Sequence, residues 1–207
     1  MKNRSILLYT SLVFISFVFM FSACSNSTGG GEEIIGDHSA QTTQESDIIT
    51  ETNSVRTDPT AYAAMLEAEL PTITNPATRD EYNTAINALK GTLARSPLSF
   101  EQGLFFAARD HAADMVMNNF FNHPGSNGST VDKRISRYGT WSVSCGENIA
   151  AGRPTAANVV KAWVLSTGHR NNILNSSFTK IGVAHISGHP TYNWVSVQVF
   201  TGGYVSN

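Results

Sequence analysis

The feature that most constrains the fold is a valine-rich segment near the end of the chain. Val195, Val197 and Val199 alternate there with other side chains, among them the large Trp194 and Phe200. A period of two predicts a β-strand. Because both faces of this strand carry large residues, we expect helices to cover the sheet on both sides.

The segment before this strand predicts its partner. Ile181, Val183 and His185 alternate with smaller residues, and the stretch 188–191 reads Gly-His-Pro-Thr, which is typical of a turn. The two segments therefore predict an antiparallel hairpin.

Helical spacing dominates the part of the chain before the hairpin. Asp58-Pro59 and Asn75-Pro76 are each followed by apolar residues three or four apart, as at the start of a helix. Ser99 with Gln102 predicts a capping box. The further helices are expected at about 100–118, 130–138 and 155–165. The sum predicts one α+β domain over residues 47–207, an α-β-α sandwich around a mainly antiparallel sheet.

Composition excludes several classes of protein. Of the 207 residues, 41% are hydrophobic and 14% are charged, which indicates a packed globular body. Lys and Arg number 14 and Asp and Glu number 16, so the net charge of -2 disfavours nucleic acid as a partner. The two cysteines, Cys24 and Cys145, cannot make a disulfide framework.

The N-terminus has the pattern of an export signal. Lys2 and Arg4 precede an almost continuous apolar run over residues 6–21. The run ends in Phe-Ser-Ala before Cys24, which resembles a bacterial lipoprotein signal in which this cysteine is lipidated, although Phe21 stands where Leu is usual. An uncleaved membrane anchor is the alternative, but the run is shorter than the roughly 20 residues that span a bilayer. We expect an exported domain held by Cys24 on the cell membrane or the outer membrane.

Residues 25–46 predict a flexible tether between this signal and the body. The segment is rich in Gly, Ser and Thr and has no aromatic residue. His38 lies within it, and we assign no role to this histidine.

Four segments stand out because polar side chains and glycine occur within them or directly beside them. They are F-F-N-H at 120–123, C-G-E-N-I-A at 145–150, W-V-L-S-T-G-H-R-N-N-I-L at 163–174, and the final strand. In this order they resemble the signature blocks of the CAP superfamily, also called the SCP domain, and its bacterial branch above all. The resemblance also includes the N-S-V-R-T-D-P stretch at 53–59 and covers about residues 47–203.

The resemblance implies an α-β-α sandwich with a shallow cavity where two histidines and one or two acidic residues meet, often around zinc or another divalent metal. By position, the histidines are His123 and His169, and the first acid is Glu147. The second acid of the eukaryotic branch falls at Ser166, so this chain lacks it.

Two imidazoles suit zinc and leave coordination positions for water or a substrate oxygen. A metal held by His123 and His169 would be labile, and its affinity should fall as they protonate below about pH 6.5. Glu147 either completes a set of three ligands or accepts a proton from metal-bound water. Ser166 and His169 suggest a nucleophile with its base, but Ser166 also reads as an ordinary helix terminator.

Other polar residues have plainer interpretations. His111 is expected to be a helix or core histidine, His185 and His189 to be strand and turn residues, and Cys145 to be a buried small apolar residue. Asn148 is expected to be a structural hydrogen-bond donor. Arg170 is left undecided between bracing Glu147 and bracing a chain terminus.

Three functions fit the sequence. The first is a membrane-anchored module whose cleft at His123, Glu147, Ser166 and His169 binds a small ligand, a lipid or a protein partner. The second is a metal-assisted hydrolase in which Glu147 is catalytic, which would also need oxyanion donors that a sequence cannot display. The third is a structural surface adhesin.

Overall fold

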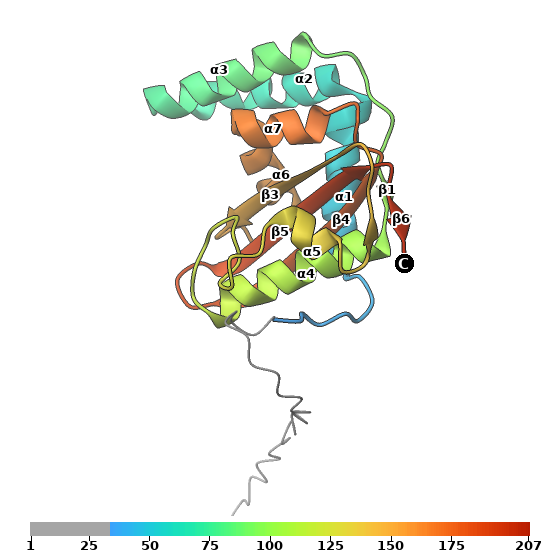
Figure 1. Ribbon diagram of the computed structural model, residues 1–207. Helices are drawn as coiled ribbons and strands as arrows, with labels where there is room; N and C mark the ends of the chain where they lie inside the picture. The colour runs from blue at the N-terminus through green and yellow to red at the C-terminus, as the bar shows by residue number, and fades with distance from the viewer. Residues whose placement is uncertain (1–33) are drawn as a thin grey trace, which may run out of the picture. The chain divides into compact units, whose positions relative to one another are not determined.

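A four-stranded sheet forms the centre of the fold in the computed structural model, which describes residues 34–207 (Figure 1). The strands are β1 (Ser99–Phe100), β3 (Ser144–Ala151), β4 (Lys180–His189) and β5 (Asn193–Gly202), in the spatial order β1-β4-β5-β3. Only the short β1 runs parallel to its neighbour. A small second sheet pairs β2 (Gly139–Thr140) with β6 (Val205–Ser206). The expected export signal, residues 1–24, lies outside the described residues.

The hairpin predicted from the alternating residues is confirmed. Strands β4 and β5 pair in an antiparallel register that closes at His189 opposite Asn193. Two residues take positive φ at this tip, Gly188 at 102° and Asn193 at 64°, in the left-handed region that Gly and Asn adopt most readily.

Helix α4 (Gln102–Met117) covers the face of the sheet on which the valines of β5 lie. Val195, Val197 and Val199 are fully buried in a cluster with the leucine and alanines of this helix. Helix α4 also comes close to β4 at Gly182, where an added Cβ would lie 2.1 Å from the Phe105 backbone nitrogen. Glycine is therefore required at this contact.

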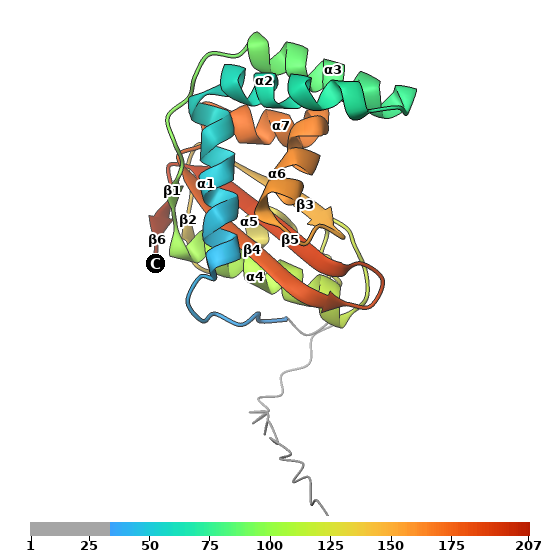
Figure 2. The same cartoon turned by 180° about the vertical axis from the view of Figure 1, so that it is seen from behind.

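The opposite face of the sheet is covered by three helices, as Figures 1 and 2 show. They are α1 (Thr43–Thr57), α6 (Ala156–Leu165) and α7 (Thr167–Leu174). Ile181, Val183 and Phe200 are buried among them. The α-β-α sandwich with helices on both faces is thus confirmed.

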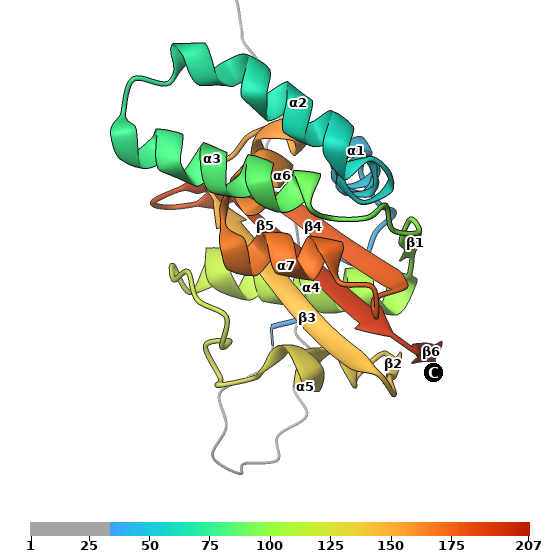
Figure 3. The same ribbon diagram turned by 90° about the horizontal axis from the view of Figure 1, so that it is seen from above.

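The remaining helices lie outside these layers. Figure 3 shows α2 (Pro59–Glu69) and α3 (Pro76–Lys90) beside each other beyond α7, with the one-turn 3-10 helix of Leu70–Thr72 between them in sequence. The short α5 (Val131–Ile135) lies on the side of α4.

Several local expectations differ from the structure. The body begins before residue 47, because α1 starts at Thr43 and Glu45 is fully buried, so the end of the expected tether belongs to the fold. The prediction of a capping box at Ser99 is wrong. Ser99 pairs in β1, and α4 is capped at Glu101 without a side-chain hydrogen bond, because the chain is held extended beside β4 up to that point.

Candidate functional site

Glu147 is a buried carboxylate on β3 that contacts two other elements. Its Oε1 accepts a hydrogen bond from His123 Nδ1 at 2.8 Å, and its Oε2 accepts one from Arg134 at 2.6 Å. His123 lies in the loop after α4, and Arg134 lies on α5. The carboxylate therefore joins β3, α5 and the loop of His123.

The Glu147 side chain remains charged at neutral pH. Burial by itself would raise its pKa, but the hydrogen bond from His123 and the charge of Arg134 more than offset burial, so the pKa is lowered. The Arg134 side chain is itself 2% exposed and also donates to the carbonyl oxygens of Ser129 and His123. This arginine holds both ends of the His123–Glu147 contact.

His111 is a third side chain close to the Glu147 carboxylate. It is buried on α4, its Nε2 lies 2.9 Å from the Asn122 carbonyl oxygen, and the same nitrogen is 3.9 Å from Glu147 Oε1. The carbonyl oxygen accepts, so Nε2 carries the proton. Burial lowers the pKa of His111 to about 4, although the Glu147 charge opposes this, so the ring is neutral at pH 7.

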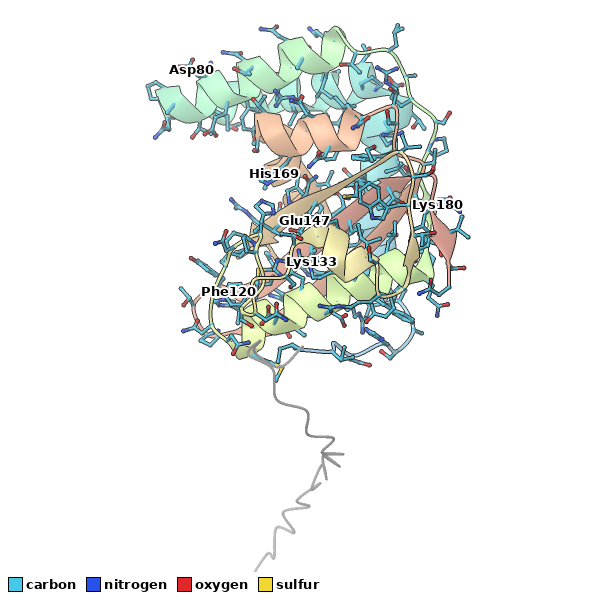
Figure 4. All side chains as sticks on the ribbon, viewed as in Figure 1. Asp80, Phe120, Lys133, Glu147, His169 and Lys180 are labelled. Carbon is cyan, nitrogen blue, oxygen red and sulfur yellow. The ribbon has the colours of Figure 1, made fainter. Side chains whose placement is uncertain are left out.

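His169 approaches from α7, on the other side of Glu147 (Figure 4). Its ring centre is 6.5 Å from that of His123. Its pKa is lowered by burial and then by the charge of His123. The His169 carbonyl oxygen accepts a hydrogen bond from Asn148, which also donates to Gln198, so the expected structural role of Asn148 is confirmed.

Ser166 lies between α6 and α7 as the N-cap residue of α7. Within the described residues its Oγ has no hydrogen-bond partner, and His169 is not bonded to it. A serine nucleophile activated by His169 therefore has no support in this geometry.

A cavity of about 320 Å³ opens beside His169. Most of its wall is apolar, and Phe121 and Tyr192 meet edge to face there with ring centres 5.7 Å apart. The polar residues of its wall are Ser166, His169, Tyr192 and Arg153. Arg153 is exposed and has no ion-pair or hydrogen-bond partner in the part of the chain that the structure describes. The cavity thus combines an apolar wall with an unpaired positive charge.

The loop that carries Phe121 and His123 is held by the β4–β5 hairpin. His189 Nε2 lies 3.1 Å from the Phe120 carbonyl oxygen, and His189 Nδ1 accepts hydrogen bonds from the backbone of Thr191 and Tyr192. His185 is a strand residue whose Nδ1 lies 2.8 Å from Ser196 Oγ. Both histidines are thus strand and turn residues, as predicted.

The two histidines that were expected to hold a metal lie near each other, and Glu147 is bound to one of them. The described residues contain no group of three or more His, Cys, Asp or Glu side chains that could hold a metal. Glu147 is engaged by His123 and Arg134, and its bond to Nδ1 leaves the His123 Nε2 lone pair available. Nitrogens about 2.0 to 2.1 Å from a shared zinc would place the two ring centres about 5 Å apart, so His123, whose side chain is 52% exposed, would have to move toward His169 from the observed 6.5 Å.

Sequence reasoning named His123, Glu147 and His169, and the structure brings these three together. It missed Arg134, because no local pattern links residue 134 to residue 147. The suggestion that Arg170 braces Glu147 is wrong: Arg170 instead donates to the Val164 carbonyl oxygen at the end of α6 and to Thr167 Oγ1 at the start of α7. Cys145 is half-buried, and burial raises the pKa of its thiol.

Comparison with solved structures gives partial matches. An extracellular protein with an SCP domain from Bacillus anthracis is 28% identical and has a TM-score of 0.44, over 58% of this chain and 38% of that one. An outer surface protein of Borrelia burgdorferi is 22% identical, with a TM-score of 0.48 over 63% of this chain and 96% of that one.

Two curated relatives come from Bacillus subtilis (strain 168). The uncharacterized protein YkwD is 38% identical over 100 residues, which are 48% of this chain and 39% of the relative. The uncharacterized membrane protein YlbC is 30% identical over 112 residues, 54% of this chain and 32% of the relative. The matched region is thus well under half the length of either relative.

The model of the family described as CAP, the cysteine-rich secretory protein family, matches residues 83–200. This match covers more than half of the chain and runs from α3 to the end region of β5. It includes His123, Glu147 and His169; of these three, His169 lines the cavity, and His123 and Glu147 lie outside its lining. The chain therefore belongs to the CAP family.

Proposed function

We propose that this chain is an extracytoplasmic, lipid-anchored CAP domain that binds a small ligand in the cleft beside His169. The cavity of about 320 Å³ carries the proposal, because its size and its apolar wall with few polar groups are typical of ligand sites. Part of the wall is built from regular elements, namely the end of β3, α6 and the start of α7, and Phe121, Arg153 and Tyr192 are added from loops and the hairpin turn.

The polar groups of the cleft define the chemistry of the ligand. Arg153 offers an unpaired guanidinium, and His169 offers a neutral ring whose pKa is lowered. The aromatic rings of Phe121 and Tyr192 offer an apolar surface on the cavity wall. An apolar molecule that carries one negatively charged group would satisfy both features.

A labile zinc ion is a second occupant that the donors allow. His123 and His169 would hold it, with Glu147 orienting His123 from outside the coordination sphere. A bound zinc would supply a positive charge to which an anionic ligand group could bind.

The metal-assisted hydrolase receives less support from this geometry. A general base works best with a pKa near the working pH, whereas the pKa of Glu147 is lowered and both of its oxygens already accept hydrogen bonds. Glu147 is better suited to positioning His123 than to moving a proton.

The anchor and the location are proposed from the sequence and one relative. The cysteine after the apolar run, Cys24, is the proposed lipidation site, and the relative YlbC is named a membrane protein. Among the described residues, none of the helices has both the length and the apolar character needed to cross a bilayer.

Binding of the anionic, apolar dye anilinonaphthalene sulfonate tests the cleft. We expect the wild-type protein to enhance the dye's fluorescence. Arg153→Gln should weaken binding about tenfold through loss of the charge, a change of about 1.4 kcal/mol. Ala162→Phe, which fills the cavity, should abolish it. Arg79→Gln removes an exposed arginine on α3, away from the cavity lining, and is the matched control.

Equal dye binding by all four proteins would refute the cleft as the ligand site. The hydrolase is tested separately with a peptide and ester library. Turnover by the wild type that is lost in Glu147→Gln would show that the chain is an enzyme and would overturn the proposal of a binding module.

A further inference from the structure

The segment just before the first helix, residues 34–42, is fixed to the outer side of α4. We name it the docked segment. Figures 1 and 2 show it running along α4, on the face of that helix that points away from the sheet. This segment was expected to be part of a free tether, so its contacts call for an explanation.

Two adjacent buried residues of α4 hold the docked segment. Asp110 is 1% exposed, and its Oδ1 accepts hydrogen bonds from the Gly36 backbone nitrogen at 2.9 Å and from His38 Nε2 at 2.8 Å. Arg109 donates to the Asp37 carbonyl oxygen at 2.6 Å and forms a two-bond ion pair with the fully buried Glu45. Asp110 thus contacts the docked segment through Oδ1, while its Oδ2 accepts hydrogen bonds from Tyr138 and Arg137. Arg109 contacts the segment through the Asp37 carbonyl oxygen.

Shape complementarity adds to these bonds. The His38 ring stacks on Phe106 with 4.1 Å between ring centres and 7° between planes. At Gly36 the backbones come so close that an added Cβ would lie 2.6 Å from the Arg109 carbonyl carbon and oxygen. Only glycine fits there, so the contact depends on the residue type and is not a chance approach.

Docking shortens the connection to Cys24. Ten peptide steps separate Cys24 from Ile34, which limits their separation to about 35 Å, whereas a tether free through residue 42 would allow about 63 Å over its 18 steps. A domain of this size is about 40 Å across, so the path around half of its surface is about 60 Å. A free tether could reach around the domain, and a docked one cannot.

We infer that the docked segment sets the orientation of the domain on the membrane, with the α4 face toward the lipid surface. Helices α2 and α3, on the far side of the sheet from α4, then cannot lie against the bilayer (Figure 1). Helices α6 and α7, with Ser166 between them and His169 on α7, lie on the sheet face opposite α4, so the ligand cleft stays accessible from outside. This inference rests on the anchor at Cys24 that the proposed function includes.

The docking contact is tested first by amide hydrogen exchange in solution. We expect the Gly36 amide to be protected in the wild type, and His38→Ala, which removes the stacked ring and one of the bonds to Asp110, to reduce this protection at least tenfold. An unprotected Gly36 amide in the wild type would overturn the inference.

The orientation is tested on nanodiscs of phosphatidylcholine and phosphatidylglycerol that contain a spin-labelled lipid. The chain from Cys24 onward, with Cys145→Ala to leave one thiol, is coupled through Cys24 to a maleimide lipid. We expect paramagnetic relaxation of amides on the outer side of α4 to exceed that in α2 and α3 at least fivefold. In Gly36→Ala the ratio should fall below two, and Gly91→Ala, whose added Cβ meets only ordinary contacts of 3.5 Å or more, should behave like the wild type.

A uniform relaxation pattern in the wild type, or an unchanged pattern in both Gly36→Ala and His38→Ala, would overturn the inference. Because the lipid is attached chemically, this result does not depend on whether cells lipidate Cys24. Failure of the natural anchor would instead appear in fatty-acid labelling, so the two failures are distinguishable.

Discussion

At the scale of single residues, the site is organised around one buried carboxylate. Glu147 accepts hydrogen bonds from His123 and Arg134 and lies near the neutral His111. Two of these three partners come from elements far from β3 in sequence. The sequence supplied His123, Glu147 and His169 through their motifs, whereas the role of Arg134 depends on how α5 packs and has no signal in the sequence.

The Arg134–Glu147 pair is predicted to matter for stability. Arg134→Met leaves a buried carboxylate without its cation, and we expect a loss of about 3 to 5 kcal/mol in the free energy of unfolding, measured by urea denaturation. The matched control is Lys90→Met, which removes one member of the half-exposed Lys90–Glu67 pair and should cost less than about 1 kcal/mol. Similar losses in the two variants would contradict the structural role of Arg134.

His111 is predicted to make the fold sensitive to acid. Its pKa is about 4 in the folded protein against 6.5 for the free side chain. Between these values the unfolded chain binds a proton that the folded chain does not, so stability is complete above about pH 6.5 and falls as the pH drops toward 4. The expected loss from this residue is on the order of 3 kcal/mol.

The variant His111→Gln tests this pH dependence, because its amide can still donate to the Asn122 carbonyl oxygen but does not titrate. Unfolding free energies measured from pH 7 to pH 4 should fall less steeply than in the wild type. His169 and His185, whose pKa values are also lowered, remain in both proteins. Parallel curves for the two proteins would show that His111 does not titrate as described.

At the scale of elements, periodicity predicted the segments whose buried side is apolar. The hairpin β4–β5 and helices α4 and α6 follow the predicted positions within a few residues, and α2 and α3 begin at the predicted prolines, Pro59 and Pro76. Helix α1 escaped prediction because the residues that it buries include Glu45, Thr52 and Arg56. Strand β3 escaped because its central residues are Gly146, Glu147 and Asn148, which have low strand propensity and are held by pairing with β5.

The contact between α4 and β4 is predicted to tolerate nothing larger than glycine at position 182. Gly182→Ala would place a methyl group against the Leu104 and Phe105 backbone, and neither backbone can yield without moving the helix. We expect a loss of about 1 to 3 kcal/mol in thermal or urea unfolding, or more if α4 shifts. Gly91→Ala, in open surroundings at the end of α3, is the control; an equal effect there would contradict the close approach.

At the scale of the described domain, the sandwich brings His123, Glu147 and His169 close together although they are far apart in sequence, and the docked segment lies on the outer side of α4. Membership of the CAP family follows from the match over residues 83–200. The ligand and the orientation are proposals that this arrangement supports, and the anchor is a proposal from the sequence.

The anchor is predicted to depend on a single atom, the Cys24 sulfur. Cells fed a labelled fatty acid should label the wild-type protein, and Cys24→Ala should carry no label. A Cys24→Ala protein labelled as strongly as the wild type would exclude lipidation at this position.

The central claim is that His123 and His169 form one site, with Glu147 acting on it through His123. Calorimetric titration of the chain after Cys24 with zinc tests this directly. We predict one weak site in the wild type and in His38→Ala, a weaker one in Glu147→Gln, and none in His123→Ala or His169→Ala. Zinc binding that is equal in all five proteins, or absent from the wild type, would contradict the claim.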